Sequence, residues 1–479
     1  MNINSNKPTV LILGGGLAGL SCAIRLLDTG MKVTVLEATP ILGGRATSWR
    51  DSDGDVIDNG FHVFFPYYEH LLTFYKKLGI EDQIHWKPAA FLTRENGGHQ
   101  VICRFPALPA PFHLLWGTLQ LLRRTFLFSF TDKLAFVWSC LRTALASNTS
   151  VENADDLSYA EWTRRSLISS RTPYIIIDSA IRALTFLTSQ QVSAKIALKW
   201  LRKISRNYHT TRVGIARRGL GELWVKAAQQ YILKHGGHIV CSTSAQHFEI
   251  HNNKIATIVC SDGVRRTANY YVAAMNVFDL RPIIPPAWLQ QAYFRNLHHL
   301  KNAPSLTAHL FFDNRITSFD SAAFAHDKIF NTHVDISLTH QHCDSNTGSI
   351  FQLVLSPADH LLNLPDEMIT TKIKEDFYEI WPEAKKCKLK KIVLLRDRQG
   401  VYAALPHMEN YRPTQKSPID HLFLAGDYTS SPIGSGGMET AVWSGNQAAQ
   451  EVIAQHNKNL NDYIETVDWE LPRLKTAVG

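Results

Sequence analysis

The residues with the clearest chemical potential lie in a glycine-rich turn close to the N-terminus. An apolar segment, 10–13, runs into Gly14 and Gly16, Gly19 follows, and the next apolar segment ends at Glu37. Gly14 permits a tight turn, Gly16 lets the backbone approach a pyrophosphate, and Gly19 lets a helix pack closely on a strand. The helix N-terminus adds free N–H groups and the positive end of its dipole. This pattern predicts a dinucleotide site in which Glu37 accepts hydrogen bonds from ribose hydroxyls.

A second glycine pair follows this turn. Gly43 and Gly44 precede Arg45, so a second turn would bring more backbone to the same diphosphate. It would also bring a guanidinium, which binds phosphate bidentately. We therefore expect Arg45 to serve the nucleotide rather than to be a plain surface cation.

The C-terminal part of the chain holds a matching set of residues. An apolar strand, 422–425, ends in Gly426 and Asp427, and a helix begins after Gly437. A carboxylate at a strand end can bind a hydroxyl or a phosphate-linked group. The helix N-terminus points N–H donors and the positive end of its dipole at a group that carries negative charge. The two ends of the chain therefore predict one shared cradle.

The elements that must position these residues alternate between strands and amphipathic helices. Hydrophobic periodicity and turn residues predict helices at 20–27, 69–78, 174–204, 220–235 and 370–381, and strands at 32–36, 239–241, 245–250, 254–260, 270–275, 305–312, 350–355 and 391–395. The sequence contains no internal repeat or low-complexity linker. We therefore expect lobes built from interleaved segments.

The composition suits a large folded protein. With 479 residues, 45% of them hydrophobic and 19% charged, the chain can bury an extensive core. The net charge of +8 comes from dispersed arginines and lysines, so no nucleic-acid partner is expected, although anionic lipid head groups would suit it. The seven cysteines include no CxxC pair, which favours a reducing compartment. The polar N-terminus is not typical of a signal peptide.

The most lipophilic stretch lies between 105 and 145. Its apolar runs are shorter than the about 20 residues that a bilayer requires. Arg123 and Arg124 also interrupt it, where a spanning helix would not tolerate them cheaply. Two interpretations stand. The helices within 112–145 face the core of a substrate lobe, or they lie in a membrane interface with the arginines at head-group level.

The motifs at both ends resemble those of a known group. Glu37, Gly43, Gly44 and Arg45 are spaced as in the GG-doublet flavoproteins, the FAD-dependent amine oxidase superfamily that includes the carotenoid desaturases. The C-terminal part resembles more specifically the phytoene desaturase and zeta-carotene desaturase branch of plants and cyanobacteria. The segments that carry this resemblance are 411–413, 417–419, 422–429, 438–439 and 444–445, with 60–65, 183–186 and 381–385 in addition.

The resemblance implies an α/β fold. A Rossmann-type FAD-binding domain would be interleaved with a mixed-sheet substrate domain and a helical lobe. The implied FAD-binding domain is discontinuous, at 1–90, 211–290 and 405–456. A helical substrate-binding or membrane-facing lobe would span 91–210, the substrate sheet 291–404, and a C-terminal tail 457–479.

The resemblance also implies FAD as the cofactor and suggests its contacts. The expected cofactor-binding residues are Gly14, Gly16, Leu17, Ala18, Gly19, Glu37, Ala38, Gly43, Gly44, Arg45, Gly60, Phe61, His62, Ala245, Gly426, Asp427, Gly437, Met438 and Ala441. For catalysis the candidates are His62 and Tyr67, in the segment expected against the flavin, and Arg202 or Lys203 on the central helices.

No metal is expected. His333, His340, His342 and Cys343 lie close together in the sequence, but their spacing matches no structural metal site. We interpret this cluster as a polar loop.

The reaction implied by the resemblance is a desaturation of a long isoprenoid. FAD would accept a hydride from an allylic carbon, and a neighbouring proton would leave to form a double bond. A membrane quinone or dioxygen would reoxidise the flavin. The implied location is cytoplasmic, with peripheral attachment to the inner face of a membrane.

Several residues depart from the carotenoid pattern and keep alternatives open. Asp58, Asn59 and Gly60 are closer to the related hydroxysqualene dehydroxylases, and Pro66 with Tyr67 replaces a pair of small residues. The alternatives are a squalene-pathway flavoenzyme, a flavin amine oxidase acting on a small amine, and a flavin-binding escort protein without turnover.

Overall fold

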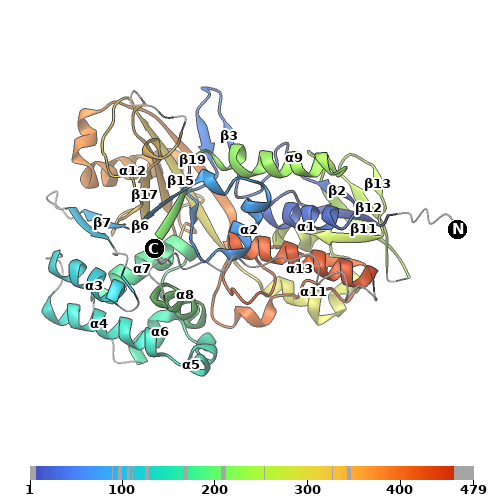
Figure 1. Cartoon of the computed structure of the whole chain (residues 1–479), viewed down its shortest axis with the longest axis horizontal. Helices are drawn as coiled ribbons and strands as arrows, with labels where there is room; N and C mark the ends of the chain where they lie inside the picture. The colour runs from blue at the N-terminus through green and yellow to red at the C-terminus, as the bar shows by residue number, and fades with distance from the viewer. Residues whose placement is uncertain are drawn as a thin grey trace, which may run out of the picture.

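The structure is a computed structural model with two distinct ends. It describes residues 7–88, 90–94, 100–104, 108–109, 112–124, 129–165, 171–206, 212–252, 254–325, 327–341, 343 and 347–457. Figure 1 shows a parallel sheet with its helices at one end, and an antiparallel sheet and a helical lobe at the other.

A five-stranded parallel sheet holds the first glycine motif. Its order is β10-β2-β1-β14-β20, and every neighbouring pair runs parallel. The strands are β1 (Thr9–Leu13), β2 (Lys32–Leu36), β10 (His238–Val240), β14 (Tyr270–Ala273) and β20 (Leu422–Leu424). Because β1 lies between β2 and β14, the strand order reverses beside it. Ligands bind at such a switch point, outside the carboxyl ends of the strands.

Alternate residues of β1 enter two different cores. Val10 and Ile12 pack with the helices α1 (Leu17–Asp28), α9 (Lys226–Lys234) and α13 (Met438–His456). Leu11 and Leu13 pack on the other face, with the antiparallel sheet β11 (Ala245–His251), β12 (Lys254–Cys260) and β13 (Arg265–Arg266). Burial on both faces explains why β1 is uniformly apolar rather than alternating.

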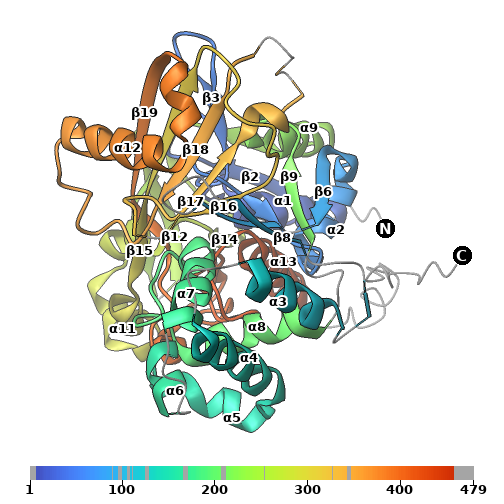
Figure 2. The same cartoon turned by 90° about the vertical axis from the view of Figure 1, so that its left-hand side faces the viewer.

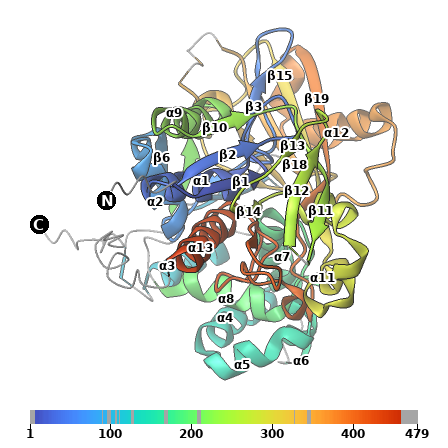
Figure 3. The ribbon, with the colours of Figure 1, turned by 90° about the vertical axis from the view of Figure 1, so that its right-hand side faces the viewer.

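Helices α1 and α13 join the two ends of the chain. They lie side by side (Figure 3), and a Cβ added to Gly445 of α13 would come within 2.1 Å of the Ala18 carbonyl oxygen of α1. Glycine is therefore required for this close helix packing. Helix α2 (Glu69–Lys77) contacts α13, and a π-helical turn at Gly221–Val225 precedes α9.

The second large sheet is antiparallel throughout, whereas a mixed sheet was expected. Its order is β16-β17-β18-β15-β19, and its strands are β15 (Asn302–Phe312), β16 (Ala323–Phe324), β17 (Thr332–Asp335), β18 (Ile350–Leu355) and β19 (Leu389–Tyr402). Antiparallel neighbours need no crossover connection, so loops suffice to join β16, β17 and β18. Helix α12 (Asp366–Ile380) packs on one face (Figure 2).

The two faces of β15 differ in chemistry. Leu306, Ala308 and Leu310 are buried in the core that includes α12. The alternating residues Ser305, Thr307 and His309 therefore point to the opposite face, away from α12. That polar face is unusual for a buried sheet, and it forms part of the site described below.

The helical lobe comprises six helices among the described residues. They are α3 (Phe112–Arg124), α4 (Phe130–Leu145), α5 (Asn148–Glu152), α6 (Tyr159–Arg165), α7 (Arg171–Thr185) and α8 (Ala194–Arg206). The single helical region expected at 174–204 is thus two helices. The chain turns at Phe186, whose φ is 57°, and the Ser189 amide donates to Asp178 Oδ1 at 2.6 Å.

Several short elements connect these parts. The strand β4 (Val56–Asp58) agrees with the sequence, in which the residues before Gly60 are typical of a strand followed by a glycine turn. The other short elements have no counterpart in the sequence prediction. They are the strands β3 (Ser48–Arg50), β5 (Val63–Phe64), β6 (Ile84–Pro88), β7 (Ala90–Arg94), β8 (Gln100–Arg104) and β9 (Arg212–Ala216), and the helices α10 (Val277–Leu280) and α11 (Ala292–Asn296). Strands this short carry too few residues for a reliable alternation.

Candidate active site

A cavity of about 1010 Å³ lies at the carboxyl edge of the parallel sheet. This places it at the upper end of the size range of small-molecule sites, on the order of 300–1,000 Å³. The expected cofactor residues that line it are Gly14, Gly16, Leu17, Ala18, Glu37, Ala38, Gly43, Gly44, Arg45, Gly60, Phe61, His62, Ala245, Gly426, Asp427, Gly437, Met438 and Ala441. The chain thus brings together residues from both of its ends.

Gly19 is the one expected cofactor residue that does not line the cavity. A Cβ added to Gly19 would lie 1.9 Å from the Gly14 carbonyl oxygen. Its role is therefore the close packing of helix on strand that its position in the motif predicts.

The two glycine pairs form a backbone cradle. The Gly43 amide donates to the Gly15 carbonyl at 2.8 Å, and a Cβ on Gly44 would lie 3.4 Å from the Gly16 Cα. A Cβ on Gly16 would meet nothing nearer than 4.0 Å and would occupy the free space instead. This bare backbone at a helix N-terminus suits a diphosphate, as FAD requires.

Glu37 is held rigidly at the end of β2. Its Oε2 accepts from the Gly15 amide and its Oε1 from the Thr39 amide, each at 2.8 Å. The Thr39 hydroxyl lies within hydrogen-bond distance of both Glu37 Oε1 and the Ile41 carbonyl, at 2.8 and 2.7 Å. A carboxylate has about four acceptor positions, so Glu37 keeps acceptor capacity for a ribose hydroxyl, the role expected for it.

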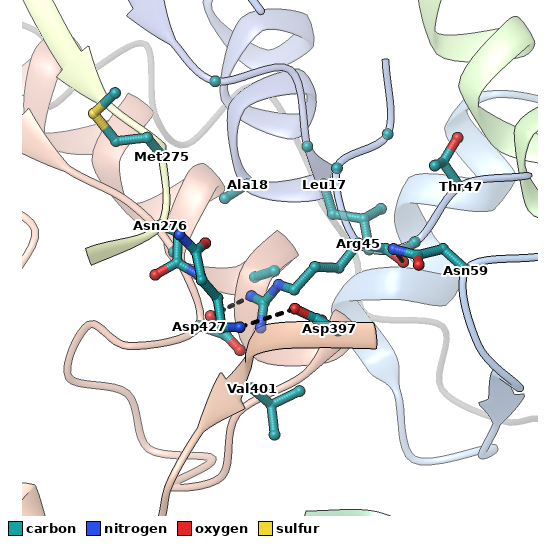
Figure 4. A pocket seen from close by; sticks show the side chains of 18 of the residues that line it. Leu17, Ala18, Arg45, Thr47, Asn59, Met275, Asn276, Asp397, Val401 and Asp427 are labelled. Atoms are coloured by element: carbon teal, nitrogen blue, oxygen red, sulfur yellow. Dashed lines mark hydrogen bonds and ion pairs between the residues drawn. The ribbon is translucent and has the colours of Figure 1, made fainter. Parts of the chain in front are cut away.

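Arg45 reaches across the cavity from the second glycine pair. Its Nη2 lies 2.6 Å from Asp427 Oδ1 (Figure 4). Its Nη1 donates to the Gly400 carbonyl. Asp427 Oδ2 also accepts from the Gly437 amide at 3.2 Å. Arg45, Asp427 and the N-terminus of α13 thus form one charged wall, which brings a guanidinium and amide donors to the site of an anionic cofactor.

His62 lies on the loop after β4 and faces the same cavity. Its Nδ1 contacts the Gly60 carbonyl at 2.9 Å. Because a carbonyl only accepts, Nδ1 carries the proton and Nε2 keeps a free lone pair. Burial, with a smaller contribution from nearby Arg45, lowers the pKa of His62 to about 4. The imidazole is therefore neutral near pH 7.

The polar face of the antiparallel sheet supplies residues that the sequence prediction missed. Ser305 and Thr307 of β15 and Asp397 of β19 line the cavity. Asp397 Oδ1 accepts from the amides of Gln399 and Gly400, at 3.2 and 2.8 Å, and so shapes the bulge that directs Gly400 to Arg45. The alternation of polar and apolar residues at 305–309 was the available signal for this face.

Tyr67 lines a smaller neighbouring cavity, of about 60 Å³, between the segment just before α2 and the helices α7, α8 and α13. Its hydroxyl accepts from Trp200 Nε1 at 2.8 Å, and burial raises its pKa well above its usual value. Lys203 also lines this cavity, with its Nζ 5.8 Å from the Tyr67 ring. The two cavities share four lining residues, which are Tyr68, Leu184, Gly436 and Met438.

Arg202 lies elsewhere. It lines neither cavity, and its Nη1 donates to Asn148 Oδ1 at 3.0 Å. On α8 the neighbouring position, Lys203, faces the smaller cavity instead. Adjacent residues of a helix point about 100° apart, so the sequence could not decide which of the two faces inward.

The expected polar loop near residue 340 is found only in part, because His340 and Cys343 lie outside helices and strands whereas His333 does not. His333 is buried in β17, and its ring lies 5.5 Å from Phe330 and 5.8 Å from Trp381. His340 is buried as well, whereas His342 lies outside the described residues. His333 of this cluster is therefore part of the aromatic core beside β17.

Within the described ranges, Asp51, Asp53 and Asp55 form a group of carboxylates close enough to share a cation. Lys391 Nζ lies 2.7, 2.7 and 2.5 Å from their oxygens. The Lys391 ammonium group already lies within contact of all three carboxylates, where a cation would bind, so we assign this cluster no metal.

Glu439 in the first turn of α13 was also missed as a site residue. It is buried, it lines the smaller cavity, and its oxygens accept from the His70 and Leu71 amides at 3.0 and 2.8 Å. It thus fixes α2 to α13. Burial raises the pKa of Glu439 to about 7, although both amides oppose the shift.

Arg45→Gln tests the charged wall. We expect the dissociation constant for FAD to rise about 10- to 100-fold, because charged hydrogen bonds contribute roughly 1.5–3 kcal/mol. Titration of apoprotein with FAD, followed near 450 nm, measures this. The control is Arg50→Gln, whose guanidinium pairs with Glu222 on the surface. Equal affinities for the two variants would contradict the assignment.

Glu439→Gln tests the buried carboxyl through pH. Glu439 holds its proton more tightly in the folded protein than at the ordinary value of 4.5. Its ionisation therefore destabilises the fold as pH rises from about 4.5 to about 7. Relative to wild type, Glu439→Gln should gain about 3 kcal/mol of unfolding free energy across that window. Urea unfolding at several pH values measures it, with exposed Glu367→Gln as the control. If the unfolding free energies of wild type and Glu439→Gln change with pH in parallel, the raised pKa of Glu439 is refuted.

Comparison with known proteins agrees with this geometry. The chain is 29% identical to a 15-cis-phytoene desaturase from Synechococcus elongatus, covering 94% of this chain and 96% of that protein. It is 27% identical to a probable zeta-carotene desaturase from the same organism, covering 93% and 98%. A solved putative protoporphyrinogen oxidase from Exiguobacterium sp. shares the fold, with a TM-score of 0.71 and 16% identity over 94% and 99% of the two chains.

The family match covers most of the chain. Residues 17–453 match the family described as flavin containing amine oxidoreductase. The expected α/β fold and FAD cofactor are thereby confirmed. The chain belongs to the flavin containing amine oxidoreductase family and is an FAD-dependent oxidoreductase.

Proposed function

We propose that this enzyme desaturates a long isoprenoid of the carotenoid class. The observation that carries the proposal is the continuity between the FAD cavity and apolar walls. Ala183, Leu184 and Phe186, in and just after α7, line the FAD cavity, and Leu184 also lines the smaller cavity beyond it. A hydrocarbon needs an apolar lining of this kind more than it needs polar contacts. The similarity to proteins named phytoene and zeta-carotene desaturase supports the same substrate class.

The proposed reaction requires a hydride acceptor and a base. FAD, when bound, supplies the hydride acceptor. The base must take a proton from the neighbouring carbon as the double bond forms, and His62 Nε2 is our candidate because it faces the cavity with a free lone pair. An imidazole of lowered pKa suffices, because a carbon next to a cationic centre is a strong acid. Tyr67 is a poor candidate, because its hydroxyl stays protonated.

Anaerobic mixing of the FAD-bound protein with candidate substrates tests the proposed function. We expect a C40 or C30 isoprenoid hydrocarbon to bleach the 450 nm absorbance and to yield a product with one more double bond. Bleaching by small amines alone would overturn the proposal in favour of an amine oxidase. The squalene-pathway alternative predicts a different result. In that case no isoprenoid would bleach the flavin, and an oxygenated isoprenoid would give product only when a reductant is added.

His62→Phe belongs to the same test. This variant should retain FAD and lower product formation by about 10²- to 10⁴-fold, the usual contribution of a positioned base. His235→Phe, on an exposed turn after α9, serves as the control. Unchanged turnover in His62→Phe would exclude it as the proton acceptor.

We propose that the helical lobe docks on an anionic membrane surface. The apolar residues exposed on α3 and α4 recur at helical spacing, and they are Phe112, Leu115, Trp116, Leu119, Phe130, Leu134, Val137, Trp138, Leu141 and Leu145. Figures 1 and 2 place both helices at the outer end of the lobe. Arg123 is exposed at the end of α3, where it can meet lipid phosphates.

This docking would place the enzyme beside its apolar substrate. No helix in the described part of the chain combines the length and apolarity that crossing a bilayer demands. We therefore propose peripheral attachment at the cytoplasmic face of a membrane. A quinone dissolved in that membrane, or dioxygen, would be the final electron acceptor.

Vesicle co-sedimentation tests the docking. Arg123→Glu plus Arg124→Glu should weaken binding to vesicles of phosphatidylcholine and phosphatidylserine at least tenfold, since each basic residue near such a surface contributes roughly 1 kcal/mol. Lys385→Glu plus Lys386→Glu, an exposed pair after α12, changes the net charge equally and should bind like wild type. Two results would count against α3 as the docking element. Either both double variants lose vesicle binding equally, or neither of them loses it.

A further inference from the structure

His309 lies beneath the flavin-facing loop without touching the cavity. It is fully buried on the polar face of β15, and it does not line either cavity. Its Nε2 contacts the Asp58 backbone carbonyl at 2.9 Å. A carbonyl only accepts, so Nε2 bears the proton and donates. Among the residues that the structure describes, none forms a hydrogen bond with His309 Nδ1.

The carbonyl that His309 contacts closes a tight turn. The Gly60 amide also donates to Asp58 O, at 2.8 Å, and Gly60 has a φ of +111°. Asp58 O therefore accepts two hydrogen bonds, one from within the turn and one from the sheet. The sheet-derived bond fixes the turn to β15.

The Asp58 side chain is fixed from two further directions. Its Oδ1 accepts from the Leu220 amide at 3.0 Å, and its Oδ2 accepts from Gln352 Nε2 at 3.2 Å. Gln352 is the direct partner of His309 in the β15–β18 pairing. His309 and Gln352 thus hold the main chain and the side chain of the same residue.

The 58–60 turn is hydrogen-bonded to two residues that line the larger cavity. The Gly60 carbonyl accepts from His62 Nδ1 at 2.9 Å, so the turn sets both the proton location and the direction of the His62 ring. Asn59, at the centre of the turn, donates through Nδ2 to the Arg45 carbonyl at 3.2 Å. The 58–60 turn therefore contacts the supports of both His62 and Arg45.

We infer that His309 is a positioning residue, which anchors the Asp58–Gly60 turn and thereby orients His62 and Arg45 towards the cofactor cavity. The inference concerns FAD binding and loop order, and its use of His62 as a base rests on the proposed function. Burial lowers the pKa of His309 to about 4, in agreement with a neutral ring that donates through one nitrogen. Nothing in this role requires His309 to touch the cofactor or the substrate.

The test compares His309→Leu with His309→Gln in the FAD-bound protein. Leucine removes the donor, whereas the glutamine amide can still donate to Asp58 O. We expect His309→Leu to speed hydrogen exchange in the 58–64 segment about tenfold or more and to raise the FAD dissociation constant several-fold. His309→Gln should remain within about twofold of wild type in both measurements. Neither readout requires a substrate, so they stay informative if the proposed desaturation is wrong.

Leu310→Ala is the matched control for general destabilisation. Leu310 is the next residue of β15, but its side chain lies in the core that includes α12. This variant should speed exchange in β15 and β18 and leave the 58–64 segment close to wild type. If His309→Leu does not fold, His309→Asn takes its place, because its shorter amide cannot span the same distance.

Two results would overturn the inference. The first is a pattern of hydrogen exchange in His309→Leu that matches Leu310→Ala, with faster exchange across β15 and β18 and no selective effect on residues 58–64. The other is a His309→Gln variant as impaired as His309→Leu, since the donor would then not be what matters.

Discussion

The close approach of two glycine-bearing turns at the end of β1 is the constraint on which the rest of the structure depends. Side chains at Gly14, Gly19 or Gly43 would collide with backbone or with neighbouring side chains, and Gly14 and Gly43 also adopt positive φ. Bare backbone at this point leaves a helix N-terminus free for a diphosphate. Every other element of the FAD site is arranged around that edge of the parallel sheet.

The two faces of the antiparallel sheet have different roles, because one packs in the protein core and the other faces the candidate active site. One face of β15 is apolar and packs in the core with α12, while the other carries Ser305, Thr307 and His309 towards the cofactor. A period of two residues allows a single strand to serve both purposes. The buried polar face is tolerable where its groups are paired, as His309 and Gln352 are with Asp58, or where they border the cavity.

Charges at the site are also shared between distant segments. Arg45 and Asp427 come from opposite ends of the chain, and Glu439 joins α13 to the first turn of α2. Each contact ties the closing helix of the FAD-binding region to residues near its beginning. Cofactor binding and the assembly of the interleaved segments are therefore expected to support each other.

Most of the fold and site features that could be predicted from the sequence depend on residues close together in the chain. The spacing of Gly14, Gly16 and Gly19, the strand ending in Asp427 and the helix after Gly437 specified the cofactor cradle, because glycine geometry and hydrophobic periodicity act within a few residues. Short strands such as β9 escaped prediction, because so few residues show no clear period.

Tertiary structure alone decided which side chains from separate elements meet. His309, Thr307, Asp397 and Glu439 looked like ordinary strand or helix residues, and Arg202 seemed as good a candidate as Lys203. Their positions depend on sheet register and helix rotation. Packing fixes both only when the whole chain has assembled. A local pattern such as the alternation at 305–309 can indicate a polar face, but it does not show which residues of other elements that face meets.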